Sequence, residues 1–401
     1  VRAMPEAIPE RAEVVVVGGG VAGLACARRL KQAGLDVVVV DRARPGSDTL
    51  STHALMRGAV IQLDRWGLLD RIRAAGTPAI RRTTFHLAGG ATVVDIRPGD
   101  GIDALYAPRR TVLDPLLADA AAAAGATVRF GFTVGQLLRN SDGRISGVLG
   151  TDRLGRSTRI RARFVVGADG ANSLVATQVE APIDEVGHGA TSYLYRYWSG
   201  VETDGYDWMF RSGVAAGVIP TNDGLACVFV GADVERITAR APDPYASLLV
   251  QASPDVADRV LAARPHGRQR RFLGRPGLVR RPWGPGWVLV GDAGYWKDPI
   301  SAHGITDALR DAELAAHAIV GAIGTTETSA SRWMGAYHDV RNRLSKDLFD
   351  VTDRVAAGDW TDDDIPLLLL AMSTAMADEV THLAELAPWP TAAVTAGVGL
   401  R

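Results

Sequence analysis

A chain of 401 residues predicts two or three domains, and its 47% of hydrophobic residues is enough for a large buried core. The formal net charge of −1 excludes the basic excess that is typical of nucleic-acid-binding proteins. Cys26 and Cys227 lie far apart in apolar stretches, so we expect core residues rather than a disulfide. The N-terminal residues lack the apolar stretch of a signal peptide, and the valine run at 14–17 is too short to cross a bilayer. We therefore expect a soluble, cytoplasmic protein with no membrane partner.

The chain begins with the pattern of a βαβ unit. Residues 13–17 form a short β-branched run, typical of a buried parallel strand, and a glycine-rich turn follows at 18–23. Helical spacing then continues as far as Gly34. The run at 36–42 predicts a second buried strand.

Helices and a hairpin follow this unit. Residues 52–75 have helical spacing, with Ser51 or Thr52 as the expected cap. Residues 81–96 predict a hairpin that turns on two adjacent glycines, and 113–125 predict a further helix. Strands then continue to about residue 170.

The pattern changes after this point. From 182 to about 275, aromatic and β-branched runs separated by turn residues predict an inserted antiparallel sheet. At 287–294 a buried strand returns to the first pattern, and the chain from 305 onward is mostly helical. The apolar run within 361–376 is shorter than the about 20 residues of a membrane span, so we expect a buried helix there.

The first glycine motif has the spacing of a dinucleotide site. Gly18 permits a tight turn, Gly20 lets a pyrophosphate approach the backbone, and Gly23 allows close helix–strand packing. Asp41, at the end of the second strand, is placed to accept hydrogen bonds from a ribose. Strand, helix and acid occur together, which favours dinucleotide binding over a simple glycine-rich turn.

Two further strands end in an aspartate motif. Residues 164–175 read FVVGADGANSLV, and 287–294 read WVLVGDAG. Each motif alone is equally consistent with a strand-end turn capped by its aspartate. The three motifs in this order resemble the FAD-dependent monooxygenases of the aromatic hydroxylase type, together with the related flavin halogenases and geranylgeranyl reductases. The resemblance covers roughly residues 13–320.

The resemblance implies an α/β fold in which a Rossmann-like FAD-binding domain carries an inserted antiparallel β-sheet substrate domain and C-terminal helices. The implied FAD-binding domain comprises 1–80, 103–180 and 281–322. The substrate domain comprises 81–102 and 181–280, and the helical region 323–401. The implied FAD-binding residues are Gly18, Gly20, Gly23, Asp41, Arg42, Arg109, Arg110, Asp169, Gly291, Asp292, Pro299, His303 and Gly304.

The sequence departs from the family pattern at two places. An arginine often follows the Asp-Gly motif, and Val175 and Ala176 stand there instead, which leaves the docking of NAD(P)H open. The motif that often reads Gly-Gln-Gly reads Ala302-His303-Gly304, yet backbone amides and a helix dipole can still bind the flavin.

The resemblance implies that NAD(P)H reduces FAD and that molecular oxygen then hydroxylates an aromatic small molecule through a flavin C4a-hydroperoxide. Reduction of an isoprenoid double bond is the alternative, because geranylgeranyl reductases share all three motifs. Halogenation is less favoured, since the tryptophan places of the halogenase motif hold Ala215 and Gly217. A flavin-binding protein without catalytic activity is the remaining alternative. We expect a monomer or a homodimer.

Aromatic residues are the candidates for substrate contact. Tyr193, Tyr195 and Tyr197 alternate along one strand and therefore share a face. Trp208 and Trp296 are further candidates. The simpler interpretation, that the tyrosines are strand formers in a core, stays open.

His53, Lys297 and His303 are the candidate catalytic residues. His53 would titrate near neutral pH if it acts as an acid or base, or it only occupies a helix start. Lys297 could pair with Asp298 or another acid, contact a cofactor phosphate or the flavin edge, or act on the substrate. The histidines have no metal-ligand spacing, so no metal is predicted.

Overall fold

The computed structural model describes residues 9–239 and 242–386, and within them the strands form four sheets. The first sheet is largely parallel, in the order β17-β18-β9-β1-β2-β5. Its strands are β1 (Val14–Val17), β2 (Val37–Asp41), β5 (Thr127–Phe130), β9 (Phe164–Gly167), β17 (Trp283–Gly284) and β18 (Trp287–Leu289). The expected α/β FAD-binding fold is confirmed.

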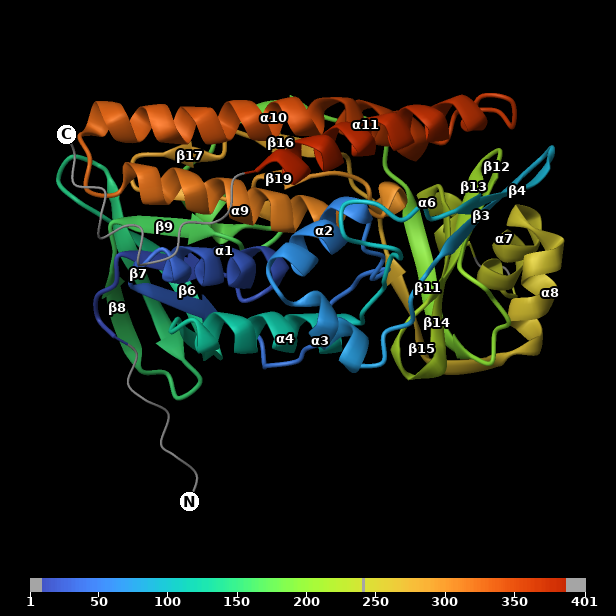
Figure 1. The fold of residues 1–401 in the computed structure, drawn as a ribbon, viewed down its shortest axis with the longest axis horizontal. Coiled ribbons are helices and arrows are strands. Elements are labelled where there is room, and N and C mark those ends of the chain that lie inside the picture. Colours follow the sequence, from blue (N-terminus) through green and yellow to red (C-terminus); the bar gives the residue numbers. More distant parts are fainter. Residues whose placement is uncertain (1–8, 240–241, 387–401) are drawn as a thin grey trace, which may run out of the picture.

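The two faces of this sheet are covered differently. Val14 and Val16 of β1 pack into a core with α1 (Val21–Gln32), α4 (Arg110–Ala123) and α9 (Gly304–Ala322), which lie beside one another in Figure 1. Val15 and Val17 pack against the antiparallel sheet of β6 (Phe132–Arg139), β7 (Ile145–Asp152) and β8 (Ser157–Arg161). The sheet is therefore buried on both sides, which explains its continuous valine runs.

The largest sheet has the order β15-β11-β14-β13-β12-β3-β4. Its strands are β3 (Arg82–Leu87), β4 (Gly90–Asp95), β11 (Ser192–Ser199), β12 (Tyr206–Arg211), β13 (Val214–Pro220), β14 (Leu225–Ala232) and β15 (Arg264–Phe272). The expected hairpin at 81–96 is β3–β4, and it joins this sheet through a parallel pairing of β3 with β12. This grouping agrees with the expected substrate domain, whose boundaries stay a prediction.

The two faces of the largest sheet also differ. On one face, Leu194 and Trp198 of β11 pack in a core with α6 (Val234–Thr238), α7 (Pro244–Ala252) and α8 (Pro254–Ala262). On the other, Tyr193, Tyr195 and Tyr197 join the main core with α1 and α9. The tyrosine face is thus the one turned toward the FAD-binding part.

A small sheet connects distant segments: β10 (Ile183–Val186), β16 (Leu278–Arg280) and β19 (Tyr295–Trp296). The C-terminal helices are α10 (Glu327–Ala357) and α11 (Ile365–Glu385). Figure 1 shows α10 running along α9, and α11 packs against α10 and α2. Residues 1–8 and 387–401 of the expected domains lie outside the described residues.

The expectation for 361–376 needs correction. Helix α11 has 21 residues and a mean hydropathy of 1.2, so in the described part of the chain it is the one helix long and apolar enough to cross a membrane. The length argument against a span is therefore wrong. Only 28% of its apolar window is buried, although Glu379 within it is fully enclosed.

The helix expected at 52–75 is also wrong in its bounds. The structure has α2 (Arg57–Arg65) and α3 (Leu69–Ala74), separated at Gly67, whose φ of +68° suits glycine. The first helix begins at Arg57 instead of after Ser51 or Thr52. His53 therefore lies in the segment before the helix, with an unusual φ of +70°.

Candidate active site

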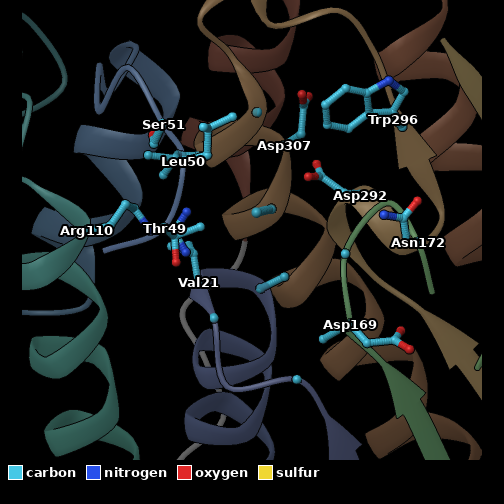
Figure 2. Close-up of a pocket in the computed structure, with 18 of the residues that line it drawn as sticks. Val21, Thr49, Leu50, Ser51, Arg110, Asp169, Asn172, Asp292, Trp296 and Asp307 are labelled. Atoms are coloured by element: carbon cyan, nitrogen blue, oxygen red, sulfur yellow. The ribbon is translucent and has the colours of Figure 1, made fainter. Parts of the chain in front are cut away.

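A cavity of about 660 Å³ lies between the carboxyl ends of the parallel strands and the tyrosine face of the large sheet. Its wall includes the first turns of α1 and α9, the motif after β9 and the segment 49–52. Figure 2 shows Arg110 and Val21 on one side of it and Asp169, Asn172 and Asp292 on the other. All three sequence motifs therefore meet at one cavity.

The first glycine motif forms the end of the cavity at α1. A Cβ on Gly18, whose φ is +113°, would lie 2.2 Å from the carbonyl oxygen of Ala168, and one on Gly23 would lie 1.9 Å from that of Gly18. Gly20 is the N-cap of α1 and makes no side-chain cap, and the first turn has no acidic residue. The free amides of this turn can therefore bind an anion.

Two polar side chains border this end. Asp41 accepts hydrogen bonds from the amides of Gly19 (2.5 Å) and Ala43 (2.6 Å) and lines the cavity, as does Arg42. Arg110 also lines it and forms a bidentate pair with Asp114 at 2.7 and 2.8 Å.

The aspartates of the other two motifs differ in their contacts. Asp169 accepts from the Ser173 hydroxyl (2.5 Å) and the amide of Leu174 (2.7 Å), so it holds the turn that leads into α5 (Leu174–Gln178). The carboxylate of Asp292 points into the cavity (Figure 2). Burial raises the pKa of Asp292, and the Lys297 charge opposes this shift.

The N-terminus of α9 forms the other end of the cavity. His303 is its N-cap and makes no side-chain cap, and Gly304, Ile305 and Ala308 line the wall. A Cβ on Gly304 would meet no described atom within 4 Å. Gly291 packs against Ala22 and Ala308 with a φ of +56° and stays behind the wall.

These features fit FAD. One open helix N-terminus suits its pyrophosphate, and a second suits the electron-rich edge of the flavin ring. Asp41 retains free lone pairs for the ribose, and Asp292 offers an acceptor to the ribityl hydroxyls.

A buried charge network lies behind the α9 end. The Lys297 ammonium pairs with Asp307, which also faces His303 Nδ1 (3.2 Å) and Arg310 Nη1 (3.1 Å). Glu379, from α11, faces His303 Nε2 (2.9 Å) and Arg310 Nη1 (2.8 Å). All five side chains are at most 4% exposed.

The network places two candidate catalytic residues. Lys297 and Asp307 line the cavity, and His303 lies behind Asp307. Burial lowers the pKa of Lys297 to about 7, with Arg310 contributing to the same shift. Asp307, and not the neighbouring Asp298, is the partner of Lys297.

Asp298 instead fixes the loop to the large sheet. It accepts from the Tyr193 hydroxyl and from the amides of Thr191 (2.8 Å) and Ile300 (2.9 Å), and it caps the short turn Pro299–Ser301. Burial raises the pKa of Asp298 to about 6, and these hydrogen bonds oppose the shift.

The substrate candidates divide into two groups. Tyr193, Tyr195 and Trp296 line the cavity, together with Phe229 and Phe272. Tyr197 and Trp208 are buried but are not among its lining residues; Trp208 packs on Phe229 and Tyr206.

His53 and Arg109 surround Tyr197 and are likewise not among the lining residues. The His53 ring hydrogen-bonds the Tyr197 hydroxyl, and Arg109 lies 4.6 Å from the Tyr197 ring centre. Burial lowers the pKa of His53 to about 3, so its imidazole is neutral at ordinary pH. The hydrogen bond of His53 to Tyr197 and its positive φ suit a structural role better than a catalytic one.

Sequence reasoning missed Asp307, Arg310 and Glu379. The spacing of the first two from His303 along one helix was a usable signal, because positions three and four apart share a face. No local pattern points to Glu379, which is brought in by α11. His303, Asp307 and Glu379 offer ligand atoms within 4.8 Å of one another, but Lys297 and Arg310 already neutralise these carboxylates.

Comparison with known proteins places the chain among flavoproteins. A family model described as FAD binding domain matches residues 11–352. The menaquinone reductase of Mycolicibacterium smegmatis is 30% identical over 344 residues, which are 80% of this chain and 79% of that protein. The digeranylgeranylglycerophospholipid reductase of Methanothrix thermoacetophila is 24% identical over 84% of this chain and 85% of its own length.

Other similar proteins have different activities. The tetracenomycin B2 monooxygenase-dioxygenase of Streptomyces olivaceus is 27% identical over 84% of this chain and 67% of its own length. The solved structure of the flavin-dependent brominase Bmp2 has a TM-score of 0.77 at 20% identity and covers 95% of this chain and 94% of its own. At that identity the likeness concerns the fold alone.

Proposed function

Because the chain belongs to the family of FAD-binding domains and is an FAD-dependent oxidoreductase, we propose that it saturates a carbon–carbon double bond in an apolar, prenyl-type substrate. The expectation of aromatic hydroxylation thereby becomes the second candidate. The relatives named as reductases support this order.

The α1 amides and Asp41 would hold the adenosine and pyrophosphate half of FAD, and Asp292 and the α9 N-terminus would hold the ribityl chain and the flavin. Bound FAD, once reduced, supplies a hydride. NAD(P)H is the electron donor that we propose.

Lys297 is the observation that carries the proposal. Saturating a double bond consumes one hydride and one proton, so the site needs a proton donor near the flavin end. Lys297 lines the cavity beside the α9 N-terminus, and burial lowers its pKa to about 7. An ammonium with that pKa gives up a proton readily near neutral pH.

The aromatic wall positions the substrate. Tyr193, Tyr195, Phe229, Phe272 and Trp296 provide an apolar surface against which a prenyl chain can pack. The same wall excludes water, which strengthens the electrostatic effect of Lys297 on the reacting carbon.

Hydroxylation remains a candidate because this wall also suits a planar ring, and one relative is a monooxygenase-dioxygenase. In that reaction molecular oxygen is a second substrate. The two candidates differ in product mass, which makes them separable in one assay.

The experiment incubates dithionite-reduced holoenzyme anaerobically with menaquinone-4, then exposes the mixture to air. Air returns the quinol ring to the quinone, so a lasting +2 mass change reports saturation of the prenyl chain. Parallel reactions contain a digeranylgeranyl glycerophospholipid, or NAD(P)H and oxygen with polycyclic phenols. If a product with a +16 mass change forms and no product with a +2 mass change forms, the proposed function is hydroxylation and not reduction.

A further inference from the structure

Both ring nitrogens of His303 face carboxylate oxygens. Nδ1 lies 3.2 Å from Asp307 Oδ1, and Nε2 lies 2.9 Å from Glu379 Oε2. An ionised carboxylate only accepts hydrogen bonds, and a neutral imidazole has a single N–H. The Nδ1 contact has the geometry of a hydrogen bond, whereas Nε2 and Oε2 lie at ion-pair distance without that geometry. Both contacts are attractive only when both ring nitrogens carry hydrogen, which is one proton more than a neutral histidine has.

The buried charges are compatible with the same proton. Within the described residues, ion pairs join the carboxylates of Asp307, Asp311 and Glu379 to the cations of Lys297 and Arg310. Buried Arg341 and Asp292 also act electrostatically on these groups. With them, four carboxylates face three cations, so a protonated His303 makes this set neutral and limits the cost of buried charge.

Asp307 connects this proton to the cavity. One of its oxygens faces His303, and the other pairs with Lys297. Asp307 and Lys297 both line the cavity, whereas Glu379 comes from α11, at the far side of the network. The order Glu379–His303–Asp307–Lys297 is thus a continuous path toward the cavity.

We propose that His303 and Glu379 hold the proton that restores Lys297, through Asp307, after each protonation of the substrate. The inference rests on the proposed function, and it makes α11 a part of the active site. Glu379 and His303 are positioning residues in this arrangement, because they act through Lys297.

The step is balanced in atoms and charge. Two electrons enter with the hydride at one carbon of the double bond, and the π electron pair of that bond takes a proton from Lys297 at the other carbon. A Lys297 N–H bond breaks and a C–H bond forms. The neutral amine then gains a proton by way of Asp307, as the N–H bond of His303 that faces Asp307 breaks. A proton from the aqueous phase replaces it on His303 before the next turnover, so each turnover consumes one hydride and one proton.

The surrounding groups act on the proton of His303 in opposite directions. Burial raises the pKa of Glu379, but His303 and Arg310 outweigh it and lower that pKa to about 2, so Glu379 stays ionised. Burial, together with the Lys297 and Arg310 cations, lowers the pKa of His303 below its ordinary value, while Glu379 raises it. The imidazolium that forms is therefore a ready proton donor, and Glu379 is the group that holds the proton on it.

Further polar groups surround the path. His382 of α11 interacts electrostatically with Glu379 and Arg310, and buried Arg341 of α10 interacts with Arg310. The Ser345 hydroxyl from α10 accepts from Arg310, the Tyr295 ring lies 5.0 Å from the Lys297 ammonium, and Asp292 borders the same cavity.

The first test observes the proton directly. Nitrogen-15 NMR of histidine-labelled holoenzyme, with His303 assigned through His303→Gln, reports whether one or both ring nitrogens carry hydrogen. We expect His303 to take up its second ring proton at a higher pH in the wild type than in Glu379→Gln, because Glu379 stabilises the imidazolium. The matched control is Glu385→Gln, an exposed glutamate of the same helix, which should leave the His303 signals unchanged. A His303 ring that stays singly protonated throughout pH 5–7 in the wild type would overturn the proposal, even if Glu379→Gln does not fold.

The second test follows turnover of menaquinone-4. In Glu379→Gln we expect a first turnover close to that of the wild type, but later turnovers with excess dithionite about tenfold slower, because Lys297 is not restored. In the same variant, the pH profile of the later-turnover rate should lose the ionisation step that belongs to the proton held by His303 and Glu379. Equal later turnovers in Glu379→Gln and Glu385→Gln would contradict the inference.

The two tests separate the inference from the proposed function. One outcome is that no double bond is reduced, but His303 becomes doubly protonated and this protonation requires Glu379. The proton held by His303 and Glu379 is then supported, and the reductase proposal is wrong. If instead a double bond is reduced while His303 stays singly protonated, the reductase proposal is supported and the held proton is wrong.

Discussion

Two helix N-termini, those of α1 and α9, open onto the same cavity without a side-chain cap, yet their surroundings differ. The first turn of α1 has no acidic residue and is shaped by glycines against backbone. The first turn of α9 contains Asp307, which pairs with Lys297 and Arg310 in a buried network.

The difference indicates that the two helix ends have different functions. An anion that stays bound needs only amides and close approach, which glycine provides. A reacting group needs charges whose protonation can change, and these must be buried and paired. Damage to the α1 end should therefore act mainly on FAD binding. Damage to the charge network of the α9 end should act mainly on stability and protonation, and FAD binding should change less there than at α1.

The largest effect is expected at α1. In Gly23→Ala the new Cβ would lie 1.9 Å from the Gly18 carbonyl oxygen, so the turn must open. We expect FAD affinity to fall about 100-fold or more, since each factor of ten requires only about 1.4 kcal/mol.

Fluorescence titration with FAD and the Tm of the FAD-free protein measure this effect. The control is Gly335→Ala in α10, where a Cβ would meet no described atom within 4 Å. This change should stabilise the helix by roughly 0.5–1 kcal/mol and leave FAD binding unchanged. Unaltered FAD affinity in Gly23→Ala would remove the basis for the α1 assignment.

The next effect is expected at α9. Arg310→Met leaves Asp307, Asp311 and Glu379 without their shared cation, and loss of one partner from a buried ion pair costs about 3–5 kcal/mol. Urea unfolding measures the loss. Arg71→Met, which removes an exposed ion pair with Asp119, should change stability little. Equal effects of the two variants would show that burial does not matter here.

A pH-dependent effect is expected at Asp298, which joins the α9 loop to the large sheet. Burial raises its pKa from 3.8 to about 6, so between these values the folded protein binds more protons than the unfolded chain. The contribution of Asp298 to the free energy of unfolding therefore falls as pH rises from 3.8 to 6, by about 3 kcal/mol at most.

Asp298→Asn should flatten the stability curve in this window, as measured by urea unfolding at a series of pH values. Asp363→Asn, at an exposed position, is the control and should keep the wild-type curve. If Asp298→Asn has the same dependence of stability on pH as the wild type, Asp298 is ionised throughout the window from pH 3.8 to 6.

The smallest effect is expected at Gly304. Its Cβ would meet no described atom within 4 Å, so Gly304→Ala should fold as stably as the wild type. The added methyl group enters the space that we assign to the flavin, and a steric cost of about 1 kcal/mol weakens FAD binding roughly fivefold. Calorimetric titration with FAD measures this. Unchanged affinity would place the flavin away from this helix end.

The sequence by itself determined the βαβ unit, the three strand-end motifs and the hairpin at 81–96. These features depend on local rules: β-branched runs, glycine spacing and alternation. The grouping of this hairpin with the later strands followed only from the family resemblance. The sequence also placed Tyr193, Tyr195 and Tyr197 on one face, because side chains alternate along a strand.

Only the tertiary structure decided which tyrosines reach the cavity, why His53 faces Tyr197, and which acid pairs with Lys297. Asp298 was the nearest acid in sequence, but it bonds Tyr193 and Thr191, and Asp307 takes the lysine instead. Glu379 lies more than seventy positions beyond His303 in the chain, and α11 brings it within 2.9 Å. Local patterns cannot contain such contacts, because the packing of whole helices determines which buried charges meet.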